Sequence, residues 1–170
     1  CMQKKIRVIH LVELNGLGGV QEAFRSYEAE SYKSCDLVHY VYSPNRPASF
    51  FYNLNVYELL FFSIIGIFSK RIIFHFYNSV GSKKVYWFLR LFRMRSVVLH
   101  EHGNAWNLDS RNSKYFRKNV RASSLTIANS KAAKSMLVQK FGCCTQKISV
   151  IYNGLNLEKV EVCIKRARLE

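Results

Sequence analysis

The sequence has 170 residues, of which 49% are hydrophobic and 14% aromatic, with only 2 prolines. This composition excludes a disordered or low-complexity chain, and the length suits one domain with a sizeable core but not two. The formal net charge of +15, from 26 basic and 11 acidic residues, predicts attraction to an anionic partner: nucleic acid, an acidic membrane surface or a phosphorylated substrate. Because basic residues recur along the whole chain instead of gathering on one element, we expect no nucleic-acid partner.

Short runs rich in β-branched and aromatic residues alternate along the chain with segments of helical periodicity. In chain order we expect a strand at 5–13, a helix at 19–33, a strand at 36–43, a helix at 55–69, a strand at 71–78, a helix at 80–94, a strand at 96–101, a helix at 111–121, a strand at 124–129, a helix at 130–141 and a strand at 147–152. Several strand runs are apolar with little alternation, as strands covered on both faces require. The pattern predicts an α/β fold, Rossmann-like, with a parallel sheet and helices on both faces.

Two of the expected helices carry much apolar surface. The window Tyr57–Phe68 has 12 residues, whereas a membrane-spanning helix needs about 20, so it predicts a buried or a membrane-contacting helix. Segment 83–95 should bury one stripe, formed by Val85, Phe88, Leu89 and Phe92. Its other side combines Trp87 with basic residues, which fits an interfacial membrane helix and an ordinary solvated face equally well.

The cysteines indicate the compartment. Five cysteines with neither CxxC spacing nor the density of a secreted disulfide scaffold indicate a reducing cytoplasm. The adjacent Cys143 and Cys144 fit a redox or metal element, but a short loop after a helix is the favoured interpretation. The N-terminal apolar run is interrupted by Arg7, His10 and Glu13, so we expect no signal peptide and a cytoplasmic protein.

Polar and small residues follow five of the expected strands, in the segments 15–22, 77–82, 101–106, 129–133 and 153–156. They include Asn78, Asn129, Ser130 and Asn153. Because ligands in open α/β sheets bind beyond the carboxyl ends of the strands, we expect these segments to converge on one crevice.

The first of these segments contains Gly16, Gly18 and Gly19, directly before a helix start. Such glycines let a backbone approach a ligand, and the free N–H groups of the helix attract phosphate. The spacing departs from GxGxxG, which disfavours a dinucleotide site, and a plain tight turn explains the glycines equally well.

His100, Glu101 and His102 end the fourth strand. Residues two apart on a strand share a face, so a metal site is geometrically feasible, but no third ligand lies nearby in sequence, and we expect no metal. His102 falls past the strand end, where it can hydrogen-bond a substrate or move a proton. His100 is expected to be buried, with its ring hydrogen-bonded to backbone.

Taken together, the segments "HLVELNGLGGVQEAF", "IIFHFYNS", "VVLHEHG", "LTIANSKAAKSML" and "KISVIYNGLN", in this order over residues 5–156, resemble the N-terminal half of GT-B glycosyltransferases of the retaining family 4. The resemblance implies that Gly18 and Gly19 lie beside the donor phosphates and the acceptor. It implies that His102, followed by Gly103, points toward the transferred sugar.

The resemblance also covers the last two strand ends. Asn129 and Ser130 match a helix-capping pair, and Ser130 is a suitable N-cap by its own chemistry. Asn153, Gly154 and Asn156 match a turn into a second domain, although Asn156 stands where Asp is usual.

In such enzymes the second domain holds the nucleotide-sugar pocket. Only 16 residues follow Gly154, too few for a domain. We therefore expect a Rossmann-like acceptor-side domain at 2–154, the start of a linker or tail at 155–170, and no activity from this chain alone.

The expected function is transfer of a sugar from a nucleotide-sugar donor to a saccharide or lipid-linked acceptor, in cell-surface polysaccharide or glycolipid synthesis, with no cofactor beyond the donor substrate. The alternative is a non-catalytic domain that binds a peripheral membrane surface or an anionic glycan, motivated by the net charge and the Trp87 helix. Both allow attachment to the inner face of an acidic membrane. A flavodoxin-like or NAD-binding domain is disfavoured because GxGxxG is absent.

Overall fold

The computed structural model describes residues 5–14, 19–31, 37–44, 47–77 and 80–152. These ranges hold seven strands and five α-helices, with two short 3₁₀ turns. The elements are β1 (Ile6–Leu11), α1 (Gly19–Ser31), β2 (Leu37–Tyr42), β3 (Tyr52–Asn53), α2 (Val56–Phe68), β4 (Ile72–Phe76), α3 (Lys83–Phe92), β5 (Val97–Glu101), η1 (Asn104–Asn107), α4 (Ser110–Ala122), β6 (Leu125–Ala128), α5 (Lys131–Phe141), η2 (Thr145–Lys147) and β7 (Ile148–Val150).

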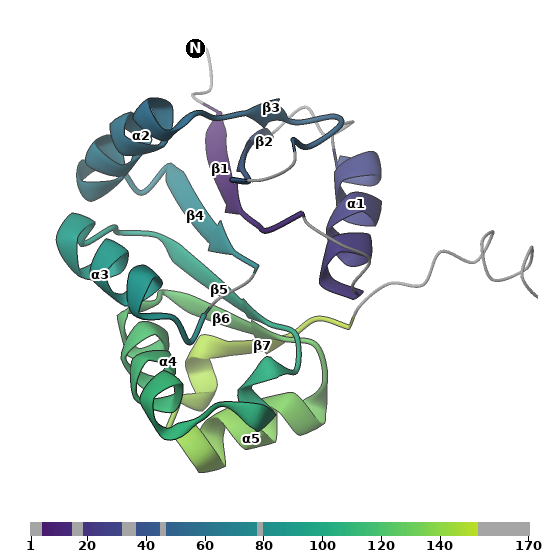
Figure 1. Ribbon diagram of the computed structural model, residues 1–170, viewed down its shortest axis with the longest axis vertical. Coiled ribbons are helices and arrows are strands. Elements are labelled where there is room, and N and C mark those ends of the chain that lie inside the picture. Colours follow the sequence, from purple (N-terminus) through teal and green to yellow (C-terminus); the bar gives the residue numbers. More distant parts are fainter. Residues whose placement is uncertain (1–4, 15–18, 32–36, 45–46, 78–79, 153–170) are drawn as a thin grey trace, which may run out of the picture.

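The strands form one parallel sheet in the order β3-β2-β1-β4-β5-β6-β7 (Figure 1). The chain starts in the middle, runs to one edge through β2 and β3, and returns through α2 to β4 on the other side of β1. The strand order therefore reverses beside β1 and β4, whose register pairs His10 with His75. Such a reversal point is where ligands bind in open α/β sheets.

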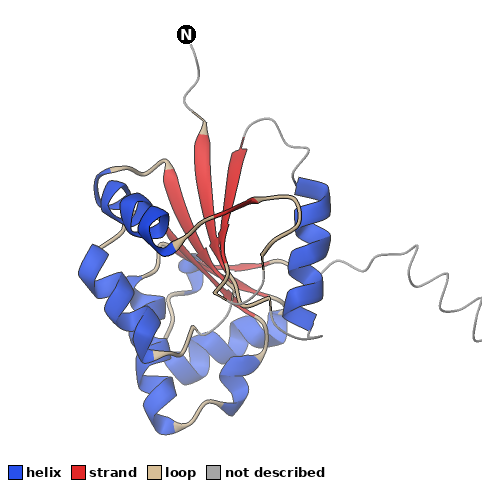
Figure 2. Cartoon of the chain, turned by 45° about the horizontal axis from the view of Figure 1, so that its top comes forward, coloured by secondary structure: helices blue, strands red, loops and turns tan. Residues whose placement is uncertain are grey.

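Helices cover the two faces of the sheet unequally. Helix α1 lies on one face, whereas α2, α3 and α4 lie on the other (Figures 1 and 2). The larger core cluster joins strand residues such as Ile9, Phe74 and Leu99 to α2–α5, and the smaller cluster packs Phe24 of α1 against Val41 of β2 and their neighbours. The expected α/β fold with helices on both faces is confirmed.

Side-chain caps fix where the helices begin. Asn55 forms a capping box with Glu58 at the start of α2, and Ser82 and Asp109 accept hydrogen bonds from the third backbone N–H of α3 and α4. Helix α5 ends at Gly142 in the left-handed conformation, which glycine adopts without steric cost.

The element boundaries differ from the expected ones by at most three residues where the structure describes them. Three features were not expected: the two-residue strand β3 and the 3₁₀ turns η1 and η2. No helix within the described residues is long and apolar enough to cross a membrane. The expected linker or tail at 155–170 lies outside the described residues.

Candidate functional site

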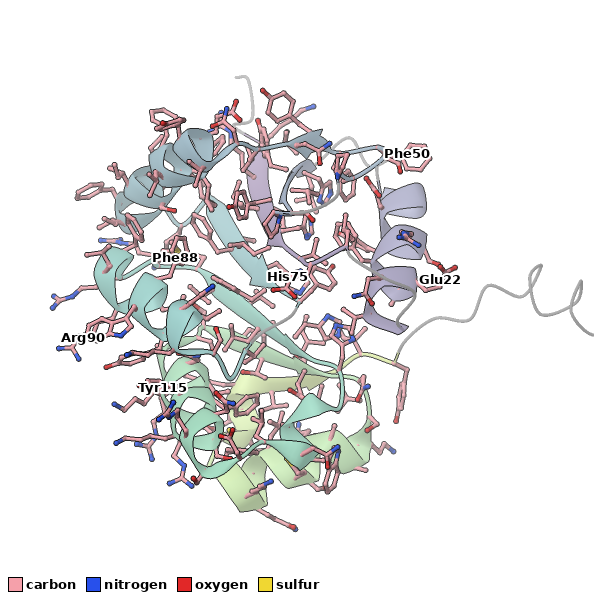
Figure 3. The ribbon with its side chains drawn as sticks, in the orientation of Figure 1. Glu22, Phe50, His75, Phe88, Arg90 and Tyr115 are labelled. Carbon is pink, nitrogen blue, oxygen red and sulfur yellow. The ribbon has the colours of Figure 1, made fainter. Side chains whose placement is uncertain are left out.

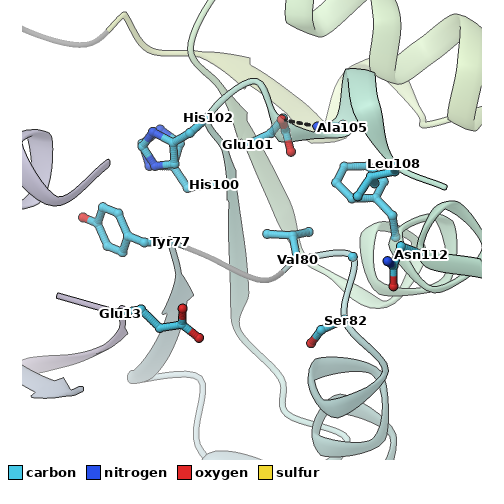
Figure 4. Close-up of a pocket in the computed structure, with 12 residues that line it drawn as sticks. Glu13, Tyr77, Val80, Ser82, His100, Glu101, His102, Ala105, Leu108 and Asn112 are labelled. Atoms are coloured by element: carbon cyan, nitrogen blue, oxygen red, sulfur yellow. Dashed lines mark hydrogen bonds between the residues drawn. The ribbon is translucent and has the colours of Figure 1, made fainter. Parts of the chain in front are cut away.

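A pocket of about 330 Å³ opens at the carboxyl edge of the sheet, beside the point where the strand order reverses. The ends of β1, β4 and β5 and the starts of α3 and α4 contribute its walls, through Glu13, Tyr77, Val80, Gly81, Ser82, His100, Glu101, His102, Ala105, Leu108, Asn112 and Phe116. Figure 4 shows Glu13, Tyr77 and His102 toward one side of it and Leu108 and Asn112 toward the other. The expected convergence of strand ends is thus found for three strands.

The turn after β5 is held by a buried carboxylate. Glu101 is 2% exposed, and its Oε1 accepts a hydrogen bond from the backbone N–H of Gly103 at 2.7 Å. The same oxygen accepts a second one from the backbone N–H of Ala105 at 2.9 Å (Figure 4). Gly103 has φ +98°, a left-handed conformation that favours glycine. Glu101 and Gly103 together fix the direction in which the chain leaves the strand, and hence the position of His102.

All five histidines of the chain lie in one row on the α1 side of the sheet. The alternation of strand side chains places them on the same face of β2, β1, β4 and β5. From His39 the row passes to His10, with 3.0 Å between Nδ1 and Nε2, then to His75 and His100 at ring-centroid distances of 5.6 Å each. It ends at His102 in the pocket, whose ring lies 3.9 Å from that of His100. Figure 3 marks His75 near the middle of the sheet.

Burial keeps these imidazoles neutral. Desolvation lowers the pKa of His75 and of His100 to about 3 each, with a smaller contribution from neighbouring histidines. Desolvation also lowers the pKa of His102 to about 4. At pH 7 the His102 ring is neutral. This ring therefore acts as a neutral hydrogen-bonding group rather than as a cation.

Neither ring nitrogen of His102 has a hydrogen-bond partner among the described residues. A buried polar group of this kind is ordinarily satisfied by water or a ligand. One nitrogen of a neutral imidazole donates and the other accepts, so His102 can orient a hydroxyl group that enters the pocket.

The expectation for His100 was wrong in one respect. Its ring is partly buried, as expected, but neither nitrogen bonds to backbone in the described part of the chain. The reason is that the His100 ring is stacked between the rings of His75 and His102, so its contacts are with these two rings and not with a main-chain group.

The other expected site residues lie at different places. Gly19 opens α1, and a Cβ added there would meet no atom within 4 Å. Ser130 caps α5 by accepting from the N–H of Ala133 at 3.0 Å, which confirms its expected N-cap role, and Asn129 precedes it at the end of β6. Neither residue lines the pocket. Gly18, Asn78 and Asn153 lie outside the described residues.

The described ranges offer no metal-binding cluster, and the thiol of Cys143 is not activated. No group of three or more His, Cys, Asp or Glu side chains in these ranges is placed to hold a metal ion. Cys143 and Cys144 are free thiols, and burial raises the pKa of Cys143 to about 11, which disfavours the reactive thiolate.

Sequence reasoning did not single out three residues that shape the site, Tyr77, Glu13 and His75, although Tyr77 opens one of the segments expected at the crevice. Tyr77 is buried beside His102, with 6.0 Å between ring centroids, and Glu13 lines the pocket from the end of β1. Glu13 and Tyr77 stand at the ends of expected strands, and this position was the available signal, whereas His75 lies within its strand and gave no such signal.

The profile of the family described as Glycosyltransferase Family 4 matches residues 24–159. Solved structures are also similar: the Anabaena protein Alr3699/HepE in complex with UDP-glucose has a TM-score of 0.62 at 16% sequence identity, and covers 90% of this chain and 45% of its own. A glycosyltransferase from Rickettsia africae ESF-5 gives a TM-score of 0.58 at 17% identity, covering 99% of this chain and 51% of its own. No curated protein sequence matches the chain significantly.

A third structure, the apo form of the lipopolysaccharide outer core galactosyltransferase WaaB, has a TM-score of 0.54 at 11% identity and covers 88% of this chain and 46% of its own. At these identities the likeness establishes the fold. The chain spans about half the length of each of these structures and has the architecture of the N-terminal half of a GT-B enzyme.

Proposed function

The chain belongs to glycosyltransferase family 4, and on that premise we propose that it forms the acceptor-side half of an enzyme that transfers a sugar from a nucleotide-sugar donor to a saccharide or lipid-linked acceptor. The observation that carries the proposal is the strand-end pocket, lined by Glu13, Tyr77 and a neutral His102 whose ring has no hydrogen-bond partner among the described residues. The complex of the Anabaena neighbour with UDP-glucose supports a nucleotide-sugar donor.

His102 is proposed to orient a hydroxyl of the transferred sugar or of the acceptor. The lowered pKa favours the neutral ring at neutral pH, and a neutral imidazole donates one hydrogen bond and accepts another. The ring is held in place by stacking on His100 and by the turn that Glu101 fixes. This fixed geometry lowers the reorganisation needed when the substrate reacts.

The start of α1 is proposed to bind the diphosphate of the donor, together with Gly18. The free backbone N–H groups of a helix start stabilise negative charge, including the charge that develops on a diphosphate leaving group. The open space around Gly19 leaves room for such an approach. Asn78, Asn129, Asn153 and Gly103 are proposed as further contributors from neighbouring strand ends.

The rest of the donor site is proposed to come from a second domain. Since the chain spans about half of its solved neighbours, we expect that the chain alone releases no nucleotide. The proposed reaction proceeds with retention in the cytoplasm, and uses the nucleotide-sugar as substrate without a further cofactor.

The test measures nucleotide diphosphate release from UDP-, GDP- and ADP-sugars by the complete enzyme, with membrane extract as acceptor. His102→Ala is expected to lower kcat/KM by at least about tenfold, the loss of one well-placed hydrogen bond. His39→Phe is the matched control, because His39 lies at the far end of the histidine row and outside the pocket.

Equal turnover of wild type and His102→Ala would refute the assigned role of His102 while leaving the transferase intact. Absence of release from every donor by a folded protein would refute the proposed reaction itself, and would favour the non-catalytic binding domain.

A further inference from the structure

Helix α2 has no polar face. Its inner side places Leu59, Ser63 and Gly66 against the core. The outer side carries large apolar residues at intervals of four, three and four positions, and all of them are exposed: Tyr57 at 79%, Phe61 at 60%, Ile64 at 54% and Phe68 at 75%. An amphipathic surface helix would have charged residues there, whereas a helix that is apolar all round is ordinarily buried or in contact with lipid.

The neighbouring helix α3 continues this apolar surface. Trp87 and Leu91, one helical turn apart, are 51% and 74% exposed. The end of α3 is tied to the end of α2, because Arg95 donates from its backbone N–H to the carbonyl of Gly66 and from Nε to that of Ile67. We call the surface formed by Tyr57, Phe61, Ile64, Phe68, Trp87 and Leu91 the α2–α3 face.

The charges around this face have one sign. Between residues 56 and 96 the only acidic residue is Glu58, which is engaged in the capping box of α2. The same segment contains seven basic residues: Lys70, Arg71, Lys83, Lys84, Arg90, Arg93 and Arg95. Arg90 lies next to the apolar residues, with its guanidinium carbon 5.6 Å from the ring centroid of Trp87, and Figure 3 shows it directed outward.

We propose that the α2–α3 face docks onto the surface of a bilayer that contains anionic lipids. Helix α2, with 13 residues, is too short to span the hydrocarbon region but long enough to lie in the interface with its apolar side chains inserted. The basic residues then meet the lipid headgroups, and each adds about fivefold to the binding constant.

A bilayer fits the face better than a second copy of this chain. Two copies joined through it would bring the same basic residues together with one carboxylate per copy, in a chain of net charge +15. Like charges at such a contact oppose association. Anionic headgroups, in contrast, neutralise the basic residues while the lipid tails receive the aromatic ones.

Membrane docking through the α2–α3 face does not depend on sugar transfer, but it would determine where the pocket lies relative to the membrane. Ser82 caps α3 and lines the pocket, and Lys83 and Lys84 directly follow it. Docking through α2 and α3 would therefore hold the pocket beside the membrane surface, within reach of a substrate that is itself anchored there.

The test is co-sedimentation of the protein with vesicles of phosphatidylcholine alone or mixed with phosphatidylglycerol. We expect binding to the mixed vesicles that weakens as salt is raised, and little binding to the neutral ones. Phe61→Ser combined with Phe68→Ser should lower binding by at least tenfold. Phe50→Ser is the control, because Phe50 is 55% exposed but lies beside α1 (Figure 3), and should bind as the wild type does.

Tryptophan fluorescence gives an independent readout. The chain has two tryptophans, so Trp106→Phe leaves Trp87 to report, and its emission should shift to the blue only with anionic vesicles. No binding by the folded protein, or unchanged binding of the Phe61/Phe68 variant, would overturn the proposal. Self-association that the same variant abolishes, without vesicle binding, would assign the face to a contact between copies and would also overturn it.

Discussion

Acidification from pH 8 to pH 5 is expected to destabilise the fold through the row of buried histidines. The pKa of His75 and of His100 is about 3 in the folded protein, chiefly because burial disfavours the charged ring, and about 6.5 in the unfolded chain. Below pH 6.5 the unfolded chain therefore binds more protons than the folded one. The stability is fully present above pH 6.5 and is lost as the pH falls from there toward 3.

The magnitude follows from the shift. At pH 5 the unfolded pKa lies 1.5 units above the pH, and each pKa unit corresponds to about 1.4 kcal/mol, so His75 lowers the free energy of unfolding by about 2 kcal/mol. His100 adds up to about the same amount. Aspartate and glutamate ordinarily titrate near pH 4, so between pH 8 and pH 5 the histidines dominate the change.

The assay is urea unfolding followed by circular dichroism at several pH values in this window. His75→Phe keeps an aromatic ring between His10 and His100 but removes its titration, so the stability of this variant should fall less steeply with acidification than that of the wild type. A wild-type stability that is flat across the window, or a slope that His75→Phe leaves unchanged, would refute the reasoning.

Three further changes test the local structure by urea unfolding at pH 7.5. Glu101→Gln removes the charge that accepts two backbone N–H groups in a buried turn, and should cost about 1–3 kcal/mol; an unchanged midpoint would contradict the role of the carboxylate. Gly66→Ala should cost about 1–3 kcal/mol because the added Cβ would come within 2.6 Å of the Phe74 ring, whereas Gly19→Ala, with no atom within 4 Å, should leave the midpoint unchanged. Ser130→Ala should cost about 1 kcal/mol by removing the α5 N-cap, and Ser130→Asp should restore it.

Local pattern was enough to predict the five α-helices and all the strands of the described residues except β3. The runs that became β4 and β5 are apolar and β-branched, and the helices between strands begin at Asn55, Ser82, Asp109 and Ser130, whose side chains cap the first turn. The strand β3 was beyond reach because its two residues are exposed and carry no periodicity. Its pairing with β2 depends on the neighbouring strand rather than on its own sequence.

The candidate site was predicted in part, for the same reason. His102 was identifiable because it stands just past an apolar run, where a parallel sheet ends. Its surroundings were not, since His75 lies 25 residues away or more in the sequence and reaches His100 only through the pairing of β4 with β5. The role of Glu101 could not be predicted from the sequence either. A glutamate between two histidines suggests a metal ligand, whereas in the structure its carboxylate accepts a hydrogen bond from the backbone N–H of Gly103.

The histidine row carries a cost that core packing alone does not explain. Within the described ranges, one ring nitrogen each of His10, His39 and His75 and both ring nitrogens of His100 and His102 are buried without a hydrogen-bond partner, and each such group opposes folding. Apolar residues at these strand positions would remove that cost. This face of the sheet accepts such residues, because Val8, Ile73 and Val98 lie on it, two positions before His10, His75 and His100. Buried polar groups without partners are concentrated at functional sites, and this row of histidines ends in the pocket. Of the five histidines, His100 and His102 line the pocket, where their neutral rings offer donors and acceptors without fixed charge, which suits a hydroxyl-rich ligand better than an ion.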